Sequence, residues 1–227
     1  MPHSMLCTSA LVASALAIGA SGASERPQSA AVQQIDLANL LASGELRAVN
    51  RTVAPLQGDR RGIHVDAKEG PGVVWIEGSD VGEGTIDAEI RGNDVQQQSF
   101  VGIAFHRKDD KTYEAVYLRP FNFRATEPDR HQHAVQYISV PEYDWPRLRK
   151  EFPEEFENPV DASLVPTDWV HLRIVVSGKT VHVYAGKVQS PTLEVRKLGT
   201  LDRGAVGLWV GNNSDGDFAD VRITPVK

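Results

Sequence analysis

The strongest constraint on the fold is a series of short segments in which apolar and polar residues alternate. In residues 85–91, Ile86, Ala88 and Ile90 alternate with polar or charged residues. Successive side chains of a strand point to opposite faces, so this period of two indicates strands with one buried face. Comparable segments occupy residues 100–106, 113–119, 134–140, 169–176, 180–185, 205–210 and 218–224. Many short strands with almost no helical period predict an all-β, antiparallel β-sandwich.

Three segments interrupt this pattern. Residues 35–46 could form a short helix or an entering strand, and Gly178-Lys179 predicts a tight hairpin between two strands. Residues 143–156 are rich in proline and charge, and we expect a long loop with about one helical turn. A long ordered loop in a small sandwich is where functional residues tend to lie.

The beginning of the chain differs from the rest. Residues 11–18 form an apolar run too short to span a bilayer, and Ser21-Gly22-Ala23 offers a cleavage site before Ser24. We therefore predict a signal peptide over residues 1–23, a flexible lead over 24–34 and a single domain over 35–227. The protein would then be secreted or periplasmic. No other segment is apolar enough to cross a membrane.

Charge and cysteine content exclude several classes of function. The net charge of −6 argues against a nucleic-acid partner, which would require a basic surface. Cys7 is the one cysteine and lies in the predicted signal peptide, so the mature chain has neither a disulfide nor a thiol nucleophile. Serine-hydrolase, phosphate-loop and dinucleotide motifs are absent from the sequence.

Asp87 and Glu89 are candidate catalytic acids on the polar side of the 85–91 strand. Strand geometry places two such carboxylates roughly 6–7 Å apart. Glycoside hydrolysis uses two carboxylates about 5–9.5 Å apart, one as acid and the other as base or nucleophile. His106, on the next predicted strand, would add a further acid–base group. A solvated strand face explains the same alternation, and for this pair we favour that interpretation.

Large polar and aromatic residues gather around the strand end at Pro120, and they are the candidate ligand-binding residues. Tyrosine offers a flat apolar face to a sugar ring, while arginine, asparagine and glutamine donate directional hydrogen bonds to hydroxyl or carboxylate groups. Cross-strand packing of arginine on tyrosine is the alternative, but here we favour a site. The set comprises Tyr117, Arg119, Asn122 and Arg124, joined by His106 and Gln136 from neighbouring strands and by Tyr143 and Trp145 from the long loop.

Two segments have the composition of divalent-metal sites. His131 and His133 stand two residues apart, a spacing at which two imidazoles on one strand face can chelate a metal. Solvated histidines, or one histidine acting as a general base, are the alternatives. Asp215 and Asp217 lie in the segment 212–217, whose oxygen ligands and glycine resemble a calcium loop. A turn explains that composition equally well.

Several strands together resemble a known family. The segments are Gly84–Ile90, Phe100–Arg107, Tyr113–Pro120, Val135–Ile138, Trp169–Val176, Gly204–Val210 and Phe218–Ile223. They are similar to bacterial concanavalin A-like lectin/glucanase domains, including laminin-G-like modules and the keto-disaccharide hydrolase-like group, over residues 35–227. The resemblance implies a jelly-roll sandwich that binds or cleaves glycans on its concave sheet.

The sequence departs from the enzymes of that family at two places. Laminarinase-like glucanases carry a Glu-x-Asp-x-x-Glu strand, whereas this chain has Asp87-Ala88-Glu89 without the third acid. The keto-sugar group carries an Asn-Ser-Gly strand where this chain has Ser99-Phe100-Val101-Gly102.

Three functional hypotheses remain open at this point. The first is a secreted carbohydrate-binding domain without chemistry, whose partner is a glycan and which requires no cofactor but could hold calcium or another divalent metal. The second is a carbohydrate-active enzyme, a glycoside hydrolase or lyase, possibly acting on keto-sugars. It would use acids such as Asp87, Glu89 or Glu114 with His106 or a loop histidine. The third is a structural periplasmic module that contacts protein. We rank carbohydrate binding first.

Overall fold

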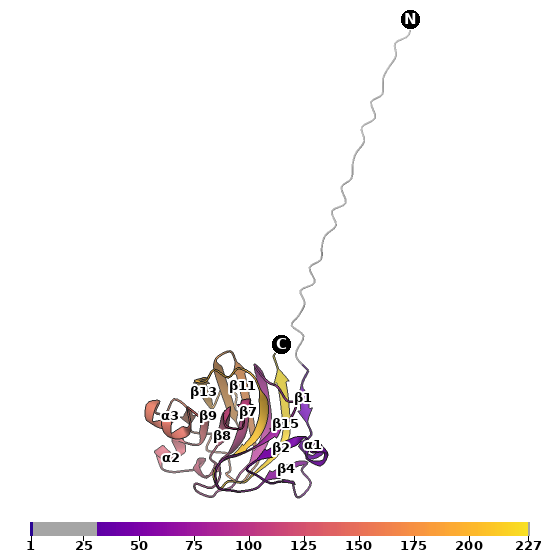
Figure 1. The fold of residues 1–227 in the computed structure, drawn as a ribbon. Helices are drawn as coiled ribbons and strands as arrows, with labels where there is room; N and C mark the ends of the chain where they lie inside the picture. Colours follow the sequence, from indigo (N-terminus) through magenta and orange to yellow (C-terminus); the bar gives the residue numbers. More distant parts are fainter. Residues whose placement is uncertain (2–30, 227) are drawn as a thin grey trace.

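Two antiparallel sheets pack face to face in the computed structural model, which describes Met1 and residues 31–226 (Figure 1). Residues 2–23 of the predicted signal peptide and residues 24–30 of the predicted lead lie outside the described residues. The last two residues of that lead, Gln33 and Gln34, belong to the first strand. Among the described residues, no helix combines the length and apolar character that a membrane crossing requires.

The first sheet has eight strands in the order β13-β12-β11-β6-β15-β4-β3, with β1 also paired to β15. Its strands are β1 (Gln33–Ile35), β3 (Val53–Pro55), β4 (Gly62–Val65), β6 (Gly84–Arg91), β11 (Val170–Ser177), β12 (Thr180–Ala185), β13 (Leu193–Arg196) and β15 (Gly216–Pro225). Strands far apart in sequence are neighbours in this sheet, as in β6 between β11 and β15.

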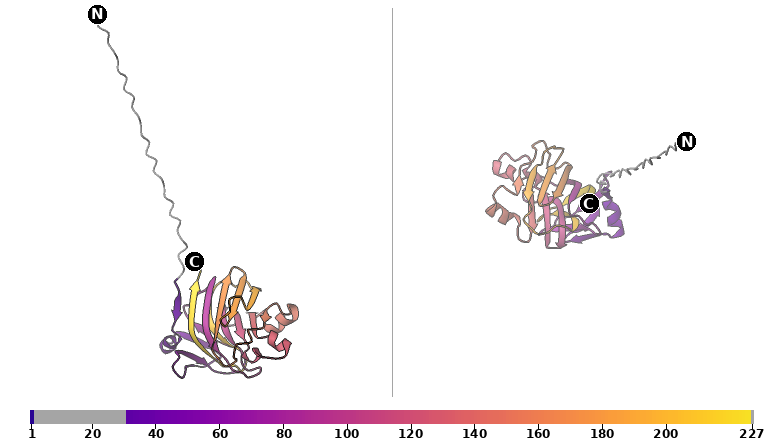
Figure 2. Two further views of the ribbon diagram at one scale, coloured as in Figure 1. Left: turned by 180° about the vertical axis from the view of Figure 1, so that it is seen from behind. Right: turned by 90° about the horizontal axis from the view of Figure 1, so that it is seen from above.

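The second sheet has seven strands in the order β10-β9-β8-β7-β14-β5-β2. Its strands are β2 (Leu46–Val49), β5 (Gly72–Ile76), β7 (Val101–Asp109), β8 (Thr112–Leu118), β9 (Val135–Val140), β10 (Glu157–Asn158) and β14 (Ala205–Val210). Four short helices complete the fold: α1 (Leu37–Ser43), the 3-10 helix η1 (Pro120–Asn122), α2 (Pro128–Gln132) and α3 (Trp145–Glu151). Helices α2 and α3 lie together at one side of the molecule and α1 at the opposite side (Figures 1 and 2).

The core lies between the two sheets and follows the alternation in the sequence. Ile86 of β6 lies opposite Ile174 of β11 in the strand register, and both are buried. Phe105 and Val116 face them from the seven-stranded sheet and are fully buried. Burying each such side chain stabilises the fold by about 1.5–3 kcal/mol. The all-β antiparallel sandwich predicted from the sequence is therefore confirmed.

The segments that interrupt the strands adopt defined local structures. Helix α1 falls within residues 35–46; Asp36 caps its first turn by accepting a hydrogen bond from the Asn39 backbone N–H (3.1 Å). Gly44 ends it with a φ of 76°, a conformation that favours glycine. The Gly178-Lys179 hairpin is confirmed. Residues 143–156 contain α3, whose seven residues make about two turns rather than one.

Candidate functional site

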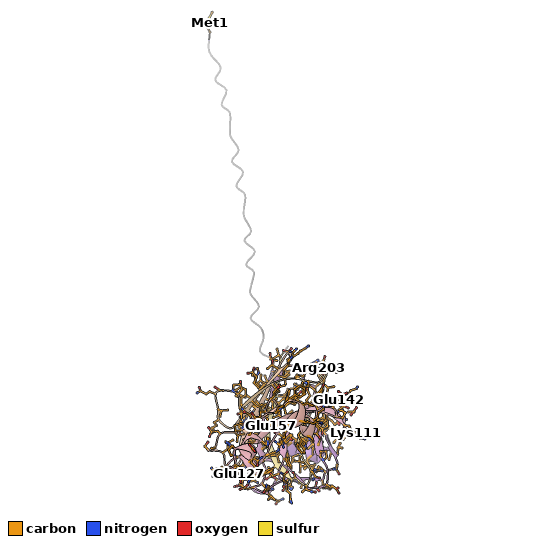
Figure 3. All side chains as sticks on the ribbon, turned by 90° about the vertical axis from the view of Figure 1, so that its left-hand side faces the viewer. Met1, Lys111, Glu127, Glu142, Glu157 and Arg203 are labelled. Carbon is orange, nitrogen blue, oxygen red and sulfur yellow. The ribbon has the colours of Figure 1, made fainter. Side chains whose placement is uncertain are left out.

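A pocket of about 420 Å³ opens on the outer face of the seven-stranded sheet. Its floor consists of side chains that point away from the core: Tyr113 of β8, Ile138 of β9 and Trp209 of β14. Its walls come from η1, α2, α3 and the loops before β5 and β7 and after β14. Figure 3 views the molecule from the side on which α2 and α3 lie.

The floor is aromatic, and its rings are held by contacts with one another. Trp209 stacks on Tyr117 with ring centroids 4.6 Å apart, and its indole N–H donates to the Tyr113 hydroxyl (3.1 Å). Phe100 and Phe121 extend the surface through an edge-to-face contact at 5.5 Å. Trp145 stands at the rim with 43% of its surface exposed. The pocket thus has a flat apolar floor with polar atoms at its edges.

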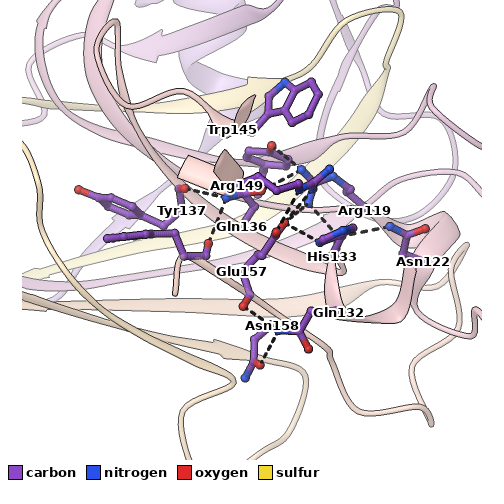
Figure 4. A network of polar contacts seen from close by, with 12 residues as sticks. Arg119, Asn122, Gln132, His133, Gln136, Tyr137, Trp145, Arg149, Glu157 and Asn158 are labelled. Atoms are coloured by element: carbon purple, nitrogen blue, oxygen red, sulfur yellow. Dashed lines mark hydrogen bonds and ion pairs between the residues drawn. The ribbon is translucent and has the colours of Figure 1, made fainter. Parts of the chain in front are cut away.

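One end of the pocket is built around the buried guanidinium of Arg119, directly after β8. It donates hydrogen bonds to the His133 carbonyl (2.8 Å), the Tyr117 hydroxyl (2.9 Å) and the Gln136 side-chain oxygen (3.0 Å; Figure 4). Asn122 donates to the same carbonyl at 3.3 Å. Burial lowers the pKa of Arg119, because water no longer stabilises its charge.

A buried carboxylate, Glu157 of β10, organises the groups behind this end (Figure 4). Arg149 of α3 binds it through two hydrogen bonds of 3.1 and 2.8 Å, the fork geometry that guanidinium and carboxylate groups share. Nδ1 of His133 lies 2.8 Å from the same carboxylate, without hydrogen-bond geometry, and Arg119 lies 3.8 Å away. Burial is the main cause that lowers the pKa of His133; Glu157 opposes it, while Arg149 and Arg119 add to it.

The structure brings most of the predicted ligand-binding residues together and separates three of them, Arg124, Tyr143 and His106. Arg119, Asn122 and Trp145 line the pocket, while Tyr117 and Gln136 lie beneath it as supports. Arg124 lines a neighbouring hollow, where it donates to the Leu164 and Ser163 carbonyls, and Tyr143 lines a third hollow beside Pro141 and Glu142.

His106 lies between the two sheets and not on the pocket side. It is fully buried; its Nδ1 is 2.5 Å from Glu114 and its Nε2 is 3.0 Å from the Gly82 carbonyl. Strict alternation along β7 would turn this side chain outward with Ala104. The pairing of β7 with β8 shifts register after Phe105, and His106 has a φ of 52°. This bulge turns the imidazole inward.

Asp87 and Glu89 lie on the outer side of β6, in the other sheet. His171 bridges them, with its Nε2 2.9 Å from Asp87 and its Nδ1 3.2 Å from Glu89, and Arg173 donates to Asp87 at 2.7 Å. Burial raises the pKa of Asp87, but the hydrogen bonds from His171 and Arg173 outweigh that effect and lower it. The hydrogen bond to Asp87 raises the pKa of His171. These acids therefore form an ion-pair cluster remote from the pocket.

This cluster should make the stability of the fold depend on pH. Because the pKa of His171 is raised above 6.5 in the folded state, its contact with Asp87 contributes fully below pH 6.5. That contribution is lost as the pH rises through the raised pKa. We expect the stability advantage of the natural chain over a His171→Gln variant to shrink as the pH rises above about 6.5 in urea unfolding. Asp87→Asn should remove most of this pH dependence, and parallel profiles for the natural and His171→Gln chains would contradict the assignment.

The predicted metal residues are engaged in other contacts. Asp215 accepts a hydrogen bond from Asn93 (2.7 Å), and Asp217 pairs with Arg91 (2.6 Å). His131 lies in α2, and His133, directly after it, faces the Glu157 carboxylate. Within residues 31–226, no three His, Cys, Asp or Glu side chains converge as metal ligands would. Residues 211–215 connect β14 to β15, and Gly216 and Asp217 already belong to β15.

Two kinds of pocket residue were not among the candidates from the sequence. Trp209 lies in a continuous apolar strand, and the sequence does not distinguish an outer face covered by loops from a core face. Arg149 lies in the proline- and charge-rich segment 143–156, where composition does not distinguish it from its charged neighbours. Its spacing of four residues from Trp145 was the available signal, since residues at that spacing share a helix face. The guanidinium lies 5.1 Å from the Trp145 ring centre.

Comparisons with known proteins support the fold but give no family by sequence. No protein-family model and no curated protein sequence matches the chain. Among solved structures, the carbohydrate-binding module CBM66 from Bacillus subtilis is similar, with a TM-score of 0.56 and 15% identity over 78% of this chain and 94% of that chain. A Bacillus subtilis protein with a galectin-like fold gives a TM-score of 0.57 and 14% identity, over 87% and 97% of the two chains.

A third similar structure is the exoplasmic/lumenal domain of VIP36, in a form bound to calcium and Man3GlcNAc. Its TM-score is 0.51 and its identity 9%, over 81% of this chain and 84% of that chain. These likenesses show that the chain has a concanavalin A-like jelly-roll fold, the fold that the sequence resemblance implied.

Proposed function

We propose that this chain is an exported carbohydrate-binding domain whose ligand occupies the pocket on the seven-stranded sheet. The observation that carries the proposal is the aromatic floor of Trp209 and Tyr113 beside the buried donor group Arg119. A sugar ring has an apolar face of C–H groups and an edge of hydroxyls, so it fits a flat ring beside directional donors.

Two further lines of support come from outside the pocket. The similar structures include a carbohydrate-binding module and a sugar-bound lumenal domain, which is an argument by analogy of fold. The apolar run at residues 11–18 supports export. Mass spectrometry of the mature chain tests the export step, with a start at Ser24 expected and an intact start at Met1 contradicting it.

The acidic groups favour binding over hydrolysis. Asp144 is the one carboxylate among the residues that line the pocket, and it caps α3 by accepting from the Trp145 backbone N–H (2.7 Å). Hydrolysis of a glycosidic bond typically uses two carboxylates on either side of that bond. The pair Asp87 and Glu89 lies on the other sheet. A hydrolase or lyase remains the alternative, and it predicts a shortened or unsaturated product.

Replacing Trp145 by alanine tests the site directly. We expect this change to weaken sugar binding about tenfold in titration calorimetry, because truncating an aromatic contact residue at a binding site costs more than about 1 kcal/mol. The matched control is Trp169→Ala, since Trp169 directly precedes β11 of the other sheet and its ring contacts Arg60 and Arg91. Equal losses in both variants would contradict the assignment of the pocket. Mass spectrometry of the recovered sugar separates binding, which returns it unchanged, from catalysis.

A further inference from the structure

The charge of the pocket differs in sign from the charge of the chain. The whole sequence has a net charge of −6. The residues that line the pocket include Arg119, Arg130 and Arg149, but only one carboxylate, Asp144. Counting the buried Glu157 behind the wall as well, the arginines still outnumber the acids by one. A local excess of positive charge on an acidic protein points to an anionic ligand.

Among these arginines, Arg119 has the positive charge that neighbouring carboxylates neutralise least. Its three hydrogen-bond acceptors are neutral oxygens of His133, Tyr117 and Gln136. The nearest carboxylate, Glu157, is 3.8 Å away and already accepts two hydrogen bonds from Arg149. A buried charge without its own counterion is costly, so an anion arriving in the pocket would offset that cost.

The other arginines extend the positive end toward solvent. Arg130 of α2 donates to the Phe121 carbonyl at 3.1 Å, and its contacts with the exposed Glu127 are long, at 3.4 and 3.5 Å. Such exposed pairs are weak and screened by water. His133 adds no charge near neutral pH, since its pKa is lowered from 6.5. The positive charges that face the ligand are therefore those of the arginines.

The shape of the surface indicates more than one sugar unit. A second hollow of about 430 Å³ shares Phe121 and Arg130 with the pocket, and Arg124 also lines it. A chain whose terminal unit filled the pocket would pass over Phe121 into this second hollow. An oligosaccharide fits the two adjoining hollows better than a single sugar does.

We propose that the ligand is an acidic oligosaccharide in which a uronic acid places its ring on the Trp209 floor and its carboxylate at the Arg119 end. This inference rests on the proposed function, because it names the class of sugar for the same pocket. A guanidinium has five N–H donors, and the three hydrogen bonds of Arg119 to protein oxygens leave two of them for a carboxylate. A neutral hydroxymethyl group in the same position would leave the positive charge unpaired.

Pairs of sugars that differ only in charge show whether the pocket recognises the carboxylate or only the rest of the sugar. The probes are trisaccharides of glucuronate, galacturonate and mannuronate, each compared with its methyl ester, which keeps the ring and removes the charge. We expect at least one acid to bind roughly tenfold or more tightly than its ester in titration calorimetry, with the preference weakening as salt is raised. Esters that bind as tightly as the acids would overturn this inference and leave carbohydrate binding standing. If neither acids, esters nor neutral oligosaccharides bind, both proposals fail.

Arginine variants identify which positively charged side chain binds the carboxylate of the sugar. Arg130→Gln should weaken acid binding about three- to tenfold and leave the ester unchanged. Arg147→Gln is the matched control, because Arg147 lies on α3 but pairs with Glu151 (2.9 Å) away from the pocket. Arg119→Lys keeps the charge but loses the planar guanidinium and its remaining N–H groups, so it should reduce the preference for acid, with a melting curve to show that the variant folds. An acid preference unchanged in both Arg130→Gln and Arg119→Lys would contradict the placement of the carboxylate.

Discussion

Replacing Glu114 by glutamine is expected to lower the free energy of unfolding by about 3–5 kcal/mol, the cost of breaking a buried ion pair from one side. Glu114 is fully buried, with His106 at 2.5 Å, the ammonium of Lys197 at 3.5 Å and the Tyr137 hydroxyl donating to it. Glutamine keeps the volume but leaves Lys197, whose side chain is only 6% exposed, without its counterion. At about 2–4 °C per kcal/mol, the melting temperature should fall by roughly 6–20 °C.

Two further variants show how much of the expected loss comes from the burial of the Glu114 carboxylate and how much from the unpaired charge of Lys197. Glu77→Gln removes an exposed carboxylate that pairs with Arg47 and Arg107, and it should cost less than about 1 kcal/mol. The double variant Glu114→Gln with Lys197→Met should recover part of the loss, because the ammonium is then gone as well. A loss below about 1 kcal/mol for Glu114→Gln alone would show that the cluster does not hold the charges as described.

The large cost follows from where the cluster lies between the sheets. His106, Glu114 and Tyr137 belong to β7, β8 and β9 of the seven-stranded sheet, while Lys197 follows β13 of the eight-stranded sheet. The lysine also donates to the Leu201 carbonyl at 2.5 Å. Losing the carboxylate therefore weakens a contact that joins the two layers, which is why we expect a global effect on unfolding.

The fold was largely predictable because the alternation is a local property of each strand. Ile86, Ala88 and Ile90 show it in β6, and the structure buries all three. His106 shows the limit of the same rule, since one bulge in β7 reverses the face on which every later side chain would be expected. A bulge depends on the partner strand, and the partner strand is not visible in the sequence.

The candidate site was predictable in part for a similar reason. Arg119 and Asn122 follow one strand directly, so their proximity was visible in the sequence. Glu157 and Arg149 reach the site only because α3 folds back against β9 and β10 extends the sheet next to β9. Such long-range packing is set by tertiary contacts and not by the composition of residues 143–156, which predicted a long loop with about one helical turn.

The second large effect is expected at Gly102 of β7, where the aromatic floor of the pocket depends on a missing side chain. Gly102 lies between Tyr117 of β8 and Trp209 of β14 in the register, and the two rings stack above it at 4.6 Å. In a Gly102→Ala variant the new Cβ would meet the Val116 carbonyl oxygen, with Tyr117 Cα at 2.5 Å and its Cβ at 2.6 Å. We expect a loss of about 3 kcal/mol or more in stability, at the upper end of overpacking.

Sugar affinity should fall at least about tenfold in the same variant, because moving β8 displaces Tyr117 and the Arg119 that follows it. Calorimetry and urea unfolding measure the two losses. Gly178→Ala is the matched control: its φ of 55° disfavours alanine, but nothing lies within 4 Å of the new Cβ. That variant should lose about 1 kcal/mol and bind sugar normally. If Gly102→Ala behaved like Gly178→Ala, strands β7 and β8 would not approach closely enough for the floor to depend on the glycine. The position of the stacked Tyr117 and Trp209 rings would then be set by Trp209 alone.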